Sequence, residues 1–181
     1  MARKPKLIDN ELTVEHIKSN LVINTVRCCS QCPIRIYAKK DETIVFGVGN
    51  ITTDTIMVLP SYDINAKIGY NTILKILQDV YKDIKGTELL EDCYVTRTIK
   101  CLNKTDFNLE KDAIKSCIYN LSYEICRIHP RKIIVFDRNA DDYIKPSIFS
   151  VKHVYSPGVM YYDNQTLKDN FIEQLKEALN D

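Results

Sequence analysis

The sequence predicts an α/β protein of three layers, in which helices cover both faces of a central, mainly parallel sheet of four strands. From residue 55 onward, short apolar runs alternate with longer segments in which apolar residues recur at helical spacing. This alternation is typical of strand–helix–strand units, whose crossover connections make neighbouring strands parallel.

Length and composition favour one folded unit. The chain has 181 residues, of which 45% are hydrophobic and 27% charged, the composition of an ordinary globular protein with a substantial core. No repeat or linker divides it. Residues 1–181 are therefore expected to form a single domain, with residues 1–25 as an N-terminal helical extension.

The elements follow from periodicity and from the residues that stop them. Strands are predicted at residues 55–59, 93–99, 132–136 and 151–155, and residues 34–50 are interpreted as a strand or hairpin at the rim. Helices are predicted at residues 11–21, 70–84, 108–128, 137–145 and 166–179. Gly86 ends the second of these, Asn108 caps the third and Pro130 closes it.

The carboxyl ends of parallel strands are where ligands bind in open α/β sheets. In this sequence those ends carry four segments, at residues 60–63, 97–100, 137–138 and 156–160. We therefore expect the functional site to be assembled from these segments.

Charge and targeting signals narrow the class of protein. Lys plus Arg number 25 and Asp plus Glu number 24, a net charge of +1, which excludes nucleic-acid binding by bulk positive charge but allows a local basic face. The chain has neither a signal peptide nor an apolar stretch that could span a membrane, so a cytoplasmic location is expected. Heavy use of Ile, Asn and Lys, with only 5 Gly, resembles proteins of an AT-rich genome such as that of a bacteriophage, whose compartment is the host cytoplasm.

Seven cysteines are unusual for such a chain. Thiols stay reduced in the cytoplasm, and an odd number suits a disulfide framework poorly, which leaves buried cysteines or a metal site. Cys29 and Cys32 form a C-x-x-C pair, which can hold one metal centre from a single turn. Cys93 and Cys126 stand alone in apolar surroundings and are interpreted as core residues. Ligand type alone leaves zinc and an iron–sulfur cluster open.

Several motifs follow one another at a specific spacing: Cys29-x-x-Cys32, Val45-Phe-Gly-Val-Gly-Asn50, Ile99-Lys-Cys101, Cys117 and His129-Pro-Arg-Lys-Ile-Ile-Val135. Their order over roughly residues 26–179 resembles the iron–sulfur branch of the uracil-DNA glycosylase superfamily. The resemblance implies that superfamily's fold and a mainly structural [4Fe–4S] cluster held by Cys29, Cys32, Cys101 and Cys117. Cys28 is an alternative to Cys29, and zinc on the same four thiolates is an alternative to the cluster.

The resemblance also locates three catalytic motifs, and all three are substituted. The family's Gly-acid-Ala-Pro-Gly after the first strand is Leu59-Pro-Ser-Tyr-Asp63 here, so Asp63 could position a water only in a shifted register. The Asn that reads the extruded uracil is replaced by Arg97, which has only donors and suits a phosphate or an acidic partner. The His that supports the departing base is replaced by Ser156.

Further residues are candidates for contacts with nucleic acid. Tyr62 and Tyr70 lie where an aromatic ring could stack on an extruded base. Pro157 keeps the turn of the family's third motif, and Met160 could act as a wedge between bases. Five basic residues could line a phosphate-facing edge: Lys100, Lys104, Arg131, Lys132 and Arg138.

Together these features predict an iron–sulfur uracil-DNA glycosylase-like protein that is catalytically degenerate. Losing one electrostatic donor costs about 10²–10³ in rate, so three substituted motifs leave little glycosylase activity. The expected role is binding DNA, or a replication or repair protein, as an accessory factor. One alternative is an active DNA glycosylase that excises uracil or a modified base through Asp63 and Ser156. Another is a protein-interaction module or inhibitor that does not bind DNA.

Overall fold

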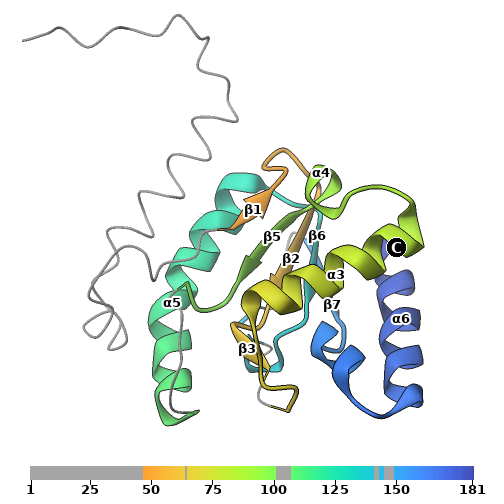
Figure 1. The fold of residues 1–181 in the computed structure, drawn as a ribbon. Helices are drawn as coiled ribbons and strands as arrows, with labels where there is room; N and C mark the ends of the chain where they lie inside the picture. Colours follow the sequence, from red (N-terminus) through yellow and green to blue (C-terminus); the bar gives the residue numbers. More distant parts are fainter. Residues whose placement is uncertain (1–46, 64, 101–106, 141–142, 145–148) are drawn as a thin grey trace, which may run out of the picture.

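The structure is a computed structural model that describes residues 47–63, 65–100, 107–140, 143–144 and 149–181 (Figure 1). The predicted helix at residues 11–21 and most of the segment 34–50 lie outside the described residues. So do three of the four predicted metal ligands, which are Cys29, Cys32 and Cys101, and the alternative ligand Cys28.

A five-stranded sheet in the order β1-β5-β2-β6-β7 forms the centre of the fold. Four of its strands are parallel: β2 (Thr55–Leu59), β5 (Tyr94–Arg97), β6 (Lys132–Val135) and β7 (Ser150–His153). The predicted mainly parallel α/β architecture is therefore confirmed. The fifth strand, β1 (Val48–Gly49), pairs antiparallel with β5 and extends the edge of the sheet.

The remaining elements are helices and short turns. These are the hairpin β3 (Tyr62–Asp63) and β4 (Ile68–Gly69), the helices α3 (Tyr70–Lys85), α4 (Leu89–Asp92), α5 (Phe107–Ile128) and α6 (Gln165–Asn180), and the 3₁₀ turns η2 (Arg138–Ala140) and η3 (Pro157–Tyr161). In the described part of the chain, no helix has the length and apolar character needed to cross a membrane.

Two apolar cores lie between the sheet and the helices, one on each face of the sheet. Because successive strand residues point to opposite faces, Met57 and Leu59 pack on the side of α3 and α6, whereas Ile56 and Val58 pack on the side of α5. Figure 1 shows α3 and α5 on opposite sides of the sheet. All four side chains are fully buried. A strand covered on both faces needs a continuous apolar run, which explains why residues 55–59 do not alternate.

Three local predictions need correction. Helix α5 already includes Phe107, so Asn108 lies within the helix and cannot be the residue that caps it. The helix expected at residues 137–145 is only the single turn η2 in its described part. The turn expected at Pro157 is the start of the longer 3₁₀ turn η3, in which Ser156 accepts a hydrogen bond from the N–H of Gly158 at 3.2 Å.

The order of the parallel strands determines where a ligand crevice forms. From β2 the chain passes through α3 to β5 on one side, and then through α5 to β6 on the other side of β2. This reversal is the switch point of an open α/β sheet, and ligands bind beside it at the carboxyl ends of the strands. We call this end of the sheet the carboxyl edge; the described residues 60–63, 97–100, 136–138 and 154–161 follow the strands there.

Gly86→Ala is expected to lower the free energy of unfolding by about 1 kcal/mol, because an L residue is strained in the left-handed region. Gly86 ends α3 with a φ of 74°, and its N–H donates to the carbonyl of Lys82 at 2.8 Å. A Cβ at this position meets no atom within 4 Å, so the substitution tests backbone strain alone. Urea denaturation followed by circular dichroism measures the effect.

Gly69→Ala is the matched control. Gly69 precedes the same helix with an extended backbone (φ −90°, ψ 172°), and its added Cβ also meets open space. Its expected change is below about 0.5 kcal/mol. Equal losses in the two variants would contradict the assignment of strain to Gly86.

Candidate functional site

Asp63 is the centre of a hydrogen-bond cluster at the carboxyl edge. Its side chain is buried, and Oδ1 accepts hydrogen bonds from the N–H groups of Asn65 and Ala66 and from the hydroxyl of Tyr162, each at 3.0 Å. Oδ2 accepts one from the hydroxyl of Ser156, also at 3.0 Å. Three of these donors reach Oδ1 and one reaches Oδ2, so most of the acceptor positions of the carboxylate are used within the protein. Asp63 thus fastens the β3–β4 turn to η3.

The segment after β7 is built around this carboxylate. Gly158 approaches it so closely that an added Cβ would lie 2.1 Å from Asp63 Oδ2, so no larger residue fits there. Ser156 directs its hydroxyl proton to Asp63 while its oxygen accepts the Gly158 N–H. Burial raises the pKa of the Tyr162 hydroxyl, and its hydrogen bond to Asp63 adds to that rise, so this group acts as a donor.

Arg97 and Tyr70 lie against each other in the interior. Arg97, the last residue of β5, is fully buried, and its guanidinium carbon lies 4.8 Å from the centre of the Tyr70 ring. Its Nη2 donates to the carbonyl of Lys100 at 2.9 Å. Tyr70 is 2% exposed, its hydroxyl has no hydrogen-bond partner among the described residues, and burial raises its pKa to about 12. The structure therefore places these two predicted nucleic-acid contacts together, beneath the surface.

A buried ion pair lies behind the carboxyl edge. The Lys100 ammonium donates to Glu124 and to Thr96, and both charged side chains are 1% exposed or less. Glu124 also accepts hydrogen bonds from the hydroxyls of Thr96, at 2.9 Å, and Tyr94, at 3.3 Å. Burial lowers the pKa of Lys100, although Glu124 opposes this effect. The expectation that Lys100 lines a phosphate-facing edge is wrong, because its side chain is inside the protein.

Cys117 is the predicted metal ligand that the structure describes. It is 2% exposed on α5, and its Sγ accepts the backbone N–H of Lys100 at 3.3 Å and a side-chain N–H of Asn120 at 4.0 Å. Because Lys100 directly precedes Cys101 in the chain, this hydrogen bond holds the backbone leading to a second predicted ligand beside Cys117. N–H donors to sulfur are a feature of protein-bound iron–sulfur clusters, so the surroundings of Cys117 fit that role.

Within the described ranges, no three His, Cys, Asp or Glu residues gather as a metal site would require. The other cysteines there have separate roles. Cys93 is buried as predicted, and burial raises the pKa of its thiol to about 11. The core assignment of Cys126 is wrong, because this residue is exposed. Cys126 follows the inward-facing Glu124 by two positions, about 200° around the helix, and so points away from the sheet.

The remaining predicted contacts lie in β3 and η3. Pro157 is buried, and Met160 is half-buried against the core shared by α3 and α6. The side chain of Tyr62 lies outside the described residues, although its backbone pairs with Gly69. The large apolar side chain most exposed on η3 is Tyr161, at 61%.

Sequence reasoning missed Glu124 and Tyr162, and only Glu124 left a visible signal. Residues 117, 121, 124 and 128 recur at helical spacing, and all four are buried on α5. An acid within such an apolar stripe predicts a buried partner. Tyr162 gave no comparable signal, because its hydrogen bond joins residues 99 positions apart in the sequence.

The chain is an α/β protein whose parallel sheet has a switch point. A polar cluster lies at the carboxyl edge, and a buried cysteine lies on the helix behind it, so this edge is the candidate ligand site. No family model matches the chain. Over 129 residues, however, the chain is 26% identical to the Type-4 uracil-DNA glycosylase of Saccharolobus solfataricus.

That match covers 69% of this chain and 58% of the relative, so the chain spans little more than half of the relative's length. The match agrees with the motif order and with the observed fold. The match supports membership of the uracil-DNA glycosylase superfamily, on the iron–sulfur branch that the cysteine motifs indicated.

Proposed function

We propose that this chain is an iron–sulfur uracil-DNA glycosylase-like protein that binds DNA as an accessory factor in replication or repair and does not excise uracil. The observation that carries the proposal is the state of Asp63. This residue is the acid nearest to the position at which the family orients the attacking water, and its carboxylate accepts four hydrogen bonds from the protein itself. A carboxylate that is held by four hydrogen bonds to the protein is fixed in a structural role, which supports the loss of its use in orienting a water for attack.

Two further residues support the loss of activity. In the family an Asn matches the donor and acceptor groups of uracil, whereas Arg97 has only donors and is buried against Tyr70. Ser156 stands where the family has the His that supports the departing base, and its hydroxyl proton is directed to Asp63. Each of the three substituted motifs is therefore engaged in contacts within the protein.

The test is incubation of the purified protein with an oligonucleotide that contains one uracil. The strand is expected to remain intact after alkaline treatment, whereas an active glycosylase leaves an abasic site that alkali cleaves. Strand cleavage at a catalytic rate, lost in Ser156→Ala, would overturn the proposal. A panel of other modified bases tests the alternative of an active enzyme with a different base preference.

DNA binding is tested separately, by fluorescence anisotropy across a range of salt concentrations. Phosphate contacts make affinity fall steeply with salt, so a steep slope is expected. Absence of binding at low salt would contradict the proposed role and favour a protein partner instead.

The proposed cofactor is a [4Fe–4S] cluster on Cys29, Cys32, Cys101 and Cys117. Cys117 supports this assignment, since its buried Sγ receives N–H groups from Lys100 and Asn120. When bound, the cluster would supply a structural link between the N-terminal segment and α5. The family relationship makes it the favoured metal centre, and analysis of iron and sulfide distinguishes it from zinc.

Cys117→Ser is expected to abolish the visible absorbance and the bound iron and sulfide of the purified protein, because it removes one of four ligands. Cys126→Ser is the matched control, since Cys126 lies on the exposed side of the same helix. This variant should retain absorbance, iron and sulfide at the wild-type level. Unchanged iron content in Cys117→Ser would exclude Cys117 as a ligand.

A further inference from the structure

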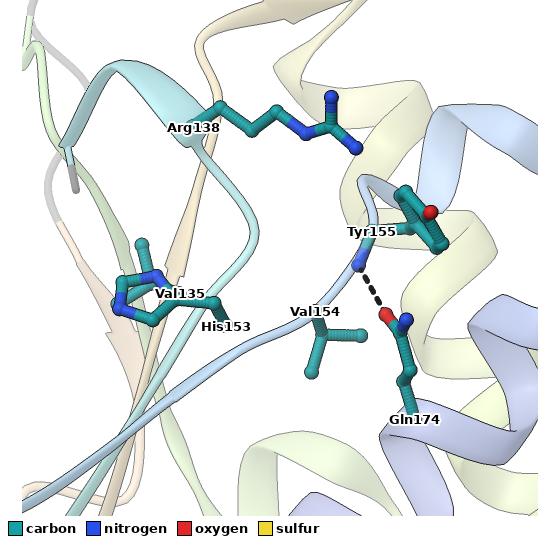
Figure 2. A pocket seen from close by; sticks show the side chains of 6 residues that line it. All are labelled: Val135, Arg138, His153, Val154, Tyr155 and Gln174. Carbon is teal, nitrogen blue, oxygen red and sulfur yellow. Dashed lines mark hydrogen bonds between the residues drawn. The ribbon is translucent and has the colours of Figure 1, made fainter.

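An open pocket of about 200 Å³ lies at the carboxyl edge, between the ends of β6 and β7 (Figure 2). It is lined by Val135, Arg138, His153, Val154, Tyr155 and Gln174. Three of these residues, 153–155, directly precede Ser156 in the chain. The lining includes neither Asp63 nor the residues that donate hydrogen bonds to it. None of its six lining residues is acidic, and two are buried valines that give it an apolar floor.

Gln174, on α6, lines this pocket with its side-chain amide. Its side-chain Oε1 accepts the backbone N–H of Tyr155 at 3.1 Å, which determines the orientation of the amide group. The Nε2 of the same amide donates to no described residue. Figure 2 shows this amide beside the loop that carries Tyr155. A fixed amide with an unused N–H is suited to an acceptor on a ligand.

Arg138, the first residue of η2, brings a positive charge to the same pocket. Its guanidinium carbon lies 5.2 Å from the centre of the Tyr155 ring, and the arginine is exposed. Arg138 forms no ion pair with a described residue. An aromatic ring under a guanidinium restricts its position while leaving its N–H groups available. A planar guanidinium with available N–H groups binds phosphate oxygens in a bidentate manner.

We propose that this pocket binds one phosphate group of a DNA strand, through the guanidinium of Arg138 and the side-chain amide of Gln174. The inference rests on the proposed DNA-binding function and gives it a defined contact. A chain with a net charge of only +1 cannot hold DNA by bulk charge, so its phosphate contacts must come from local groups of donors. The apolar floor formed by Val135 and Val154 suits the sugar carbons next to a phosphate.

The first experiment uses inorganic phosphate and requires no DNA. Titration of the isotope-labelled protein, followed by NMR, should give saturable shifts at the Tyr155 backbone amide and the Gln174 side-chain amide. Equal concentrations of chloride should not produce these shifts. Arg138→Gln and Gln174→Glu should abolish them, the second because a carboxylate repels phosphate while still accepting the Tyr155 N–H. Absence of saturable shifts in the wild-type protein would overturn the proposal.

The second experiment compares two arginines at opposite ends of β6. Arg138 follows the strand at the carboxyl edge, whereas Arg131 precedes it at the opposite end, where it is exposed and faces Asp54 at 3.5 Å. The expectation that Arg131 shares one phosphate-facing edge with Arg138 is therefore wrong, and Arg131 serves as the control. Each phosphate contact to duplex DNA contributes about 0.9 to the slope of log K against log salt. Raising the salt concentration from about 50 to 200 mM should therefore weaken the binding of a short duplex by wild type and by Arg131→Gln. For each of these two proteins the factor by which affinity falls should be roughly three times the factor for Arg138→Gln.

The outcomes separate this inference from the proposed function. If wild type binds DNA with a slope that Arg138→Gln leaves unchanged, the pocket is not a DNA phosphate site and the inference fails alone. If phosphate binds in the pocket but the wild-type protein does not bind DNA, both the DNA-binding function and this inference fail, and the phosphate belongs to another ligand. Saturable phosphate binding together with a reduced slope in Arg138→Gln alone supports the inference.

Discussion

Glu124→Ala is expected to lower the free energy of unfolding by about 4 kcal/mol, because it leaves the buried Lys100 ammonium without its counter-charge. Both side chains are almost completely inaccessible to water, so solvent cannot replace the lost carboxylate. The substitution also removes the acceptor of the Thr96 and Tyr94 hydroxyls. Urea denaturation followed by circular dichroism measures the loss.

A double substitution distinguishes the effect of the two charges from the effect of the volume that their side chains fill. Lys100→Met with Glu124→Met removes both charges and keeps much of the apolar volume, so it should cost clearly less than Glu124→Ala alone. Glu124→Gln keeps acceptors for the hydroxyls and should lie between the two. A loss below about 1 kcal/mol in Glu124→Ala would contradict the buried ion pair, since breaking such a pair costs several times more.

Asp63→Ala is expected to lower the free energy of unfolding by about 3 kcal/mol, since it removes the acceptor of four hydrogen bonds at a buried position. Two of the donors are backbone N–H groups in the β3–β4 turn, and two are the hydroxyls of Ser156 and Tyr162. Thermal and urea denaturation measure the loss.

The control for Asp63 is Ser156→Ala, which removes one of the four donors and should cost about 1 kcal/mol. If Asp63 served catalysis alone, its replacement by Ala would leave the free energy of unfolding at the wild-type value. Wild-type stability in Asp63→Ala would therefore contradict the structural role and restore Asp63 as a candidate for catalysis.

The fold could be predicted largely from local patterns. The strand β2 matches its predicted bounds, and α3 and α6 agree with theirs to within one residue. These elements are decided by residues close in sequence, namely a continuous apolar run, a helical repeat and a glycine at the end of a helix. For β1, the sequence predicted only that residues 34–50 form a strand or hairpin at the rim of the sheet. Its pairing with β5 depends on residues about 45 positions away in the chain.

The sequence predicted which residues lie at the site better than it predicted the contacts that they make. Asp63 and Ser156 were both selected from the sequence, yet their hydrogen bond joins residues 93 positions apart. The order of the motifs placed both residues near the crevice. It could not show that the Ser156 hydroxyl would donate a hydrogen bond to the Asp63 carboxylate. Arg97 was expected to face a phosphate or an acidic partner, and its burial against Tyr70 depends on how α3 packs on the sheet.

The sequence by itself indicated the superfamily, the alternation of strands and helices, and which residues stand at the positions of the family's catalytic motifs, since each depends on residue type and spacing along the chain. The tertiary structure alone decided how the substituted residues are used. It brought Asp63 to Ser156 and Tyr162, Lys100 to Glu124, and Arg138 to a pocket beside Gln174. Hydrogen bonds and ion pairs form only at short range, so contacts between distant segments are determined by the packing of helices on the sheet.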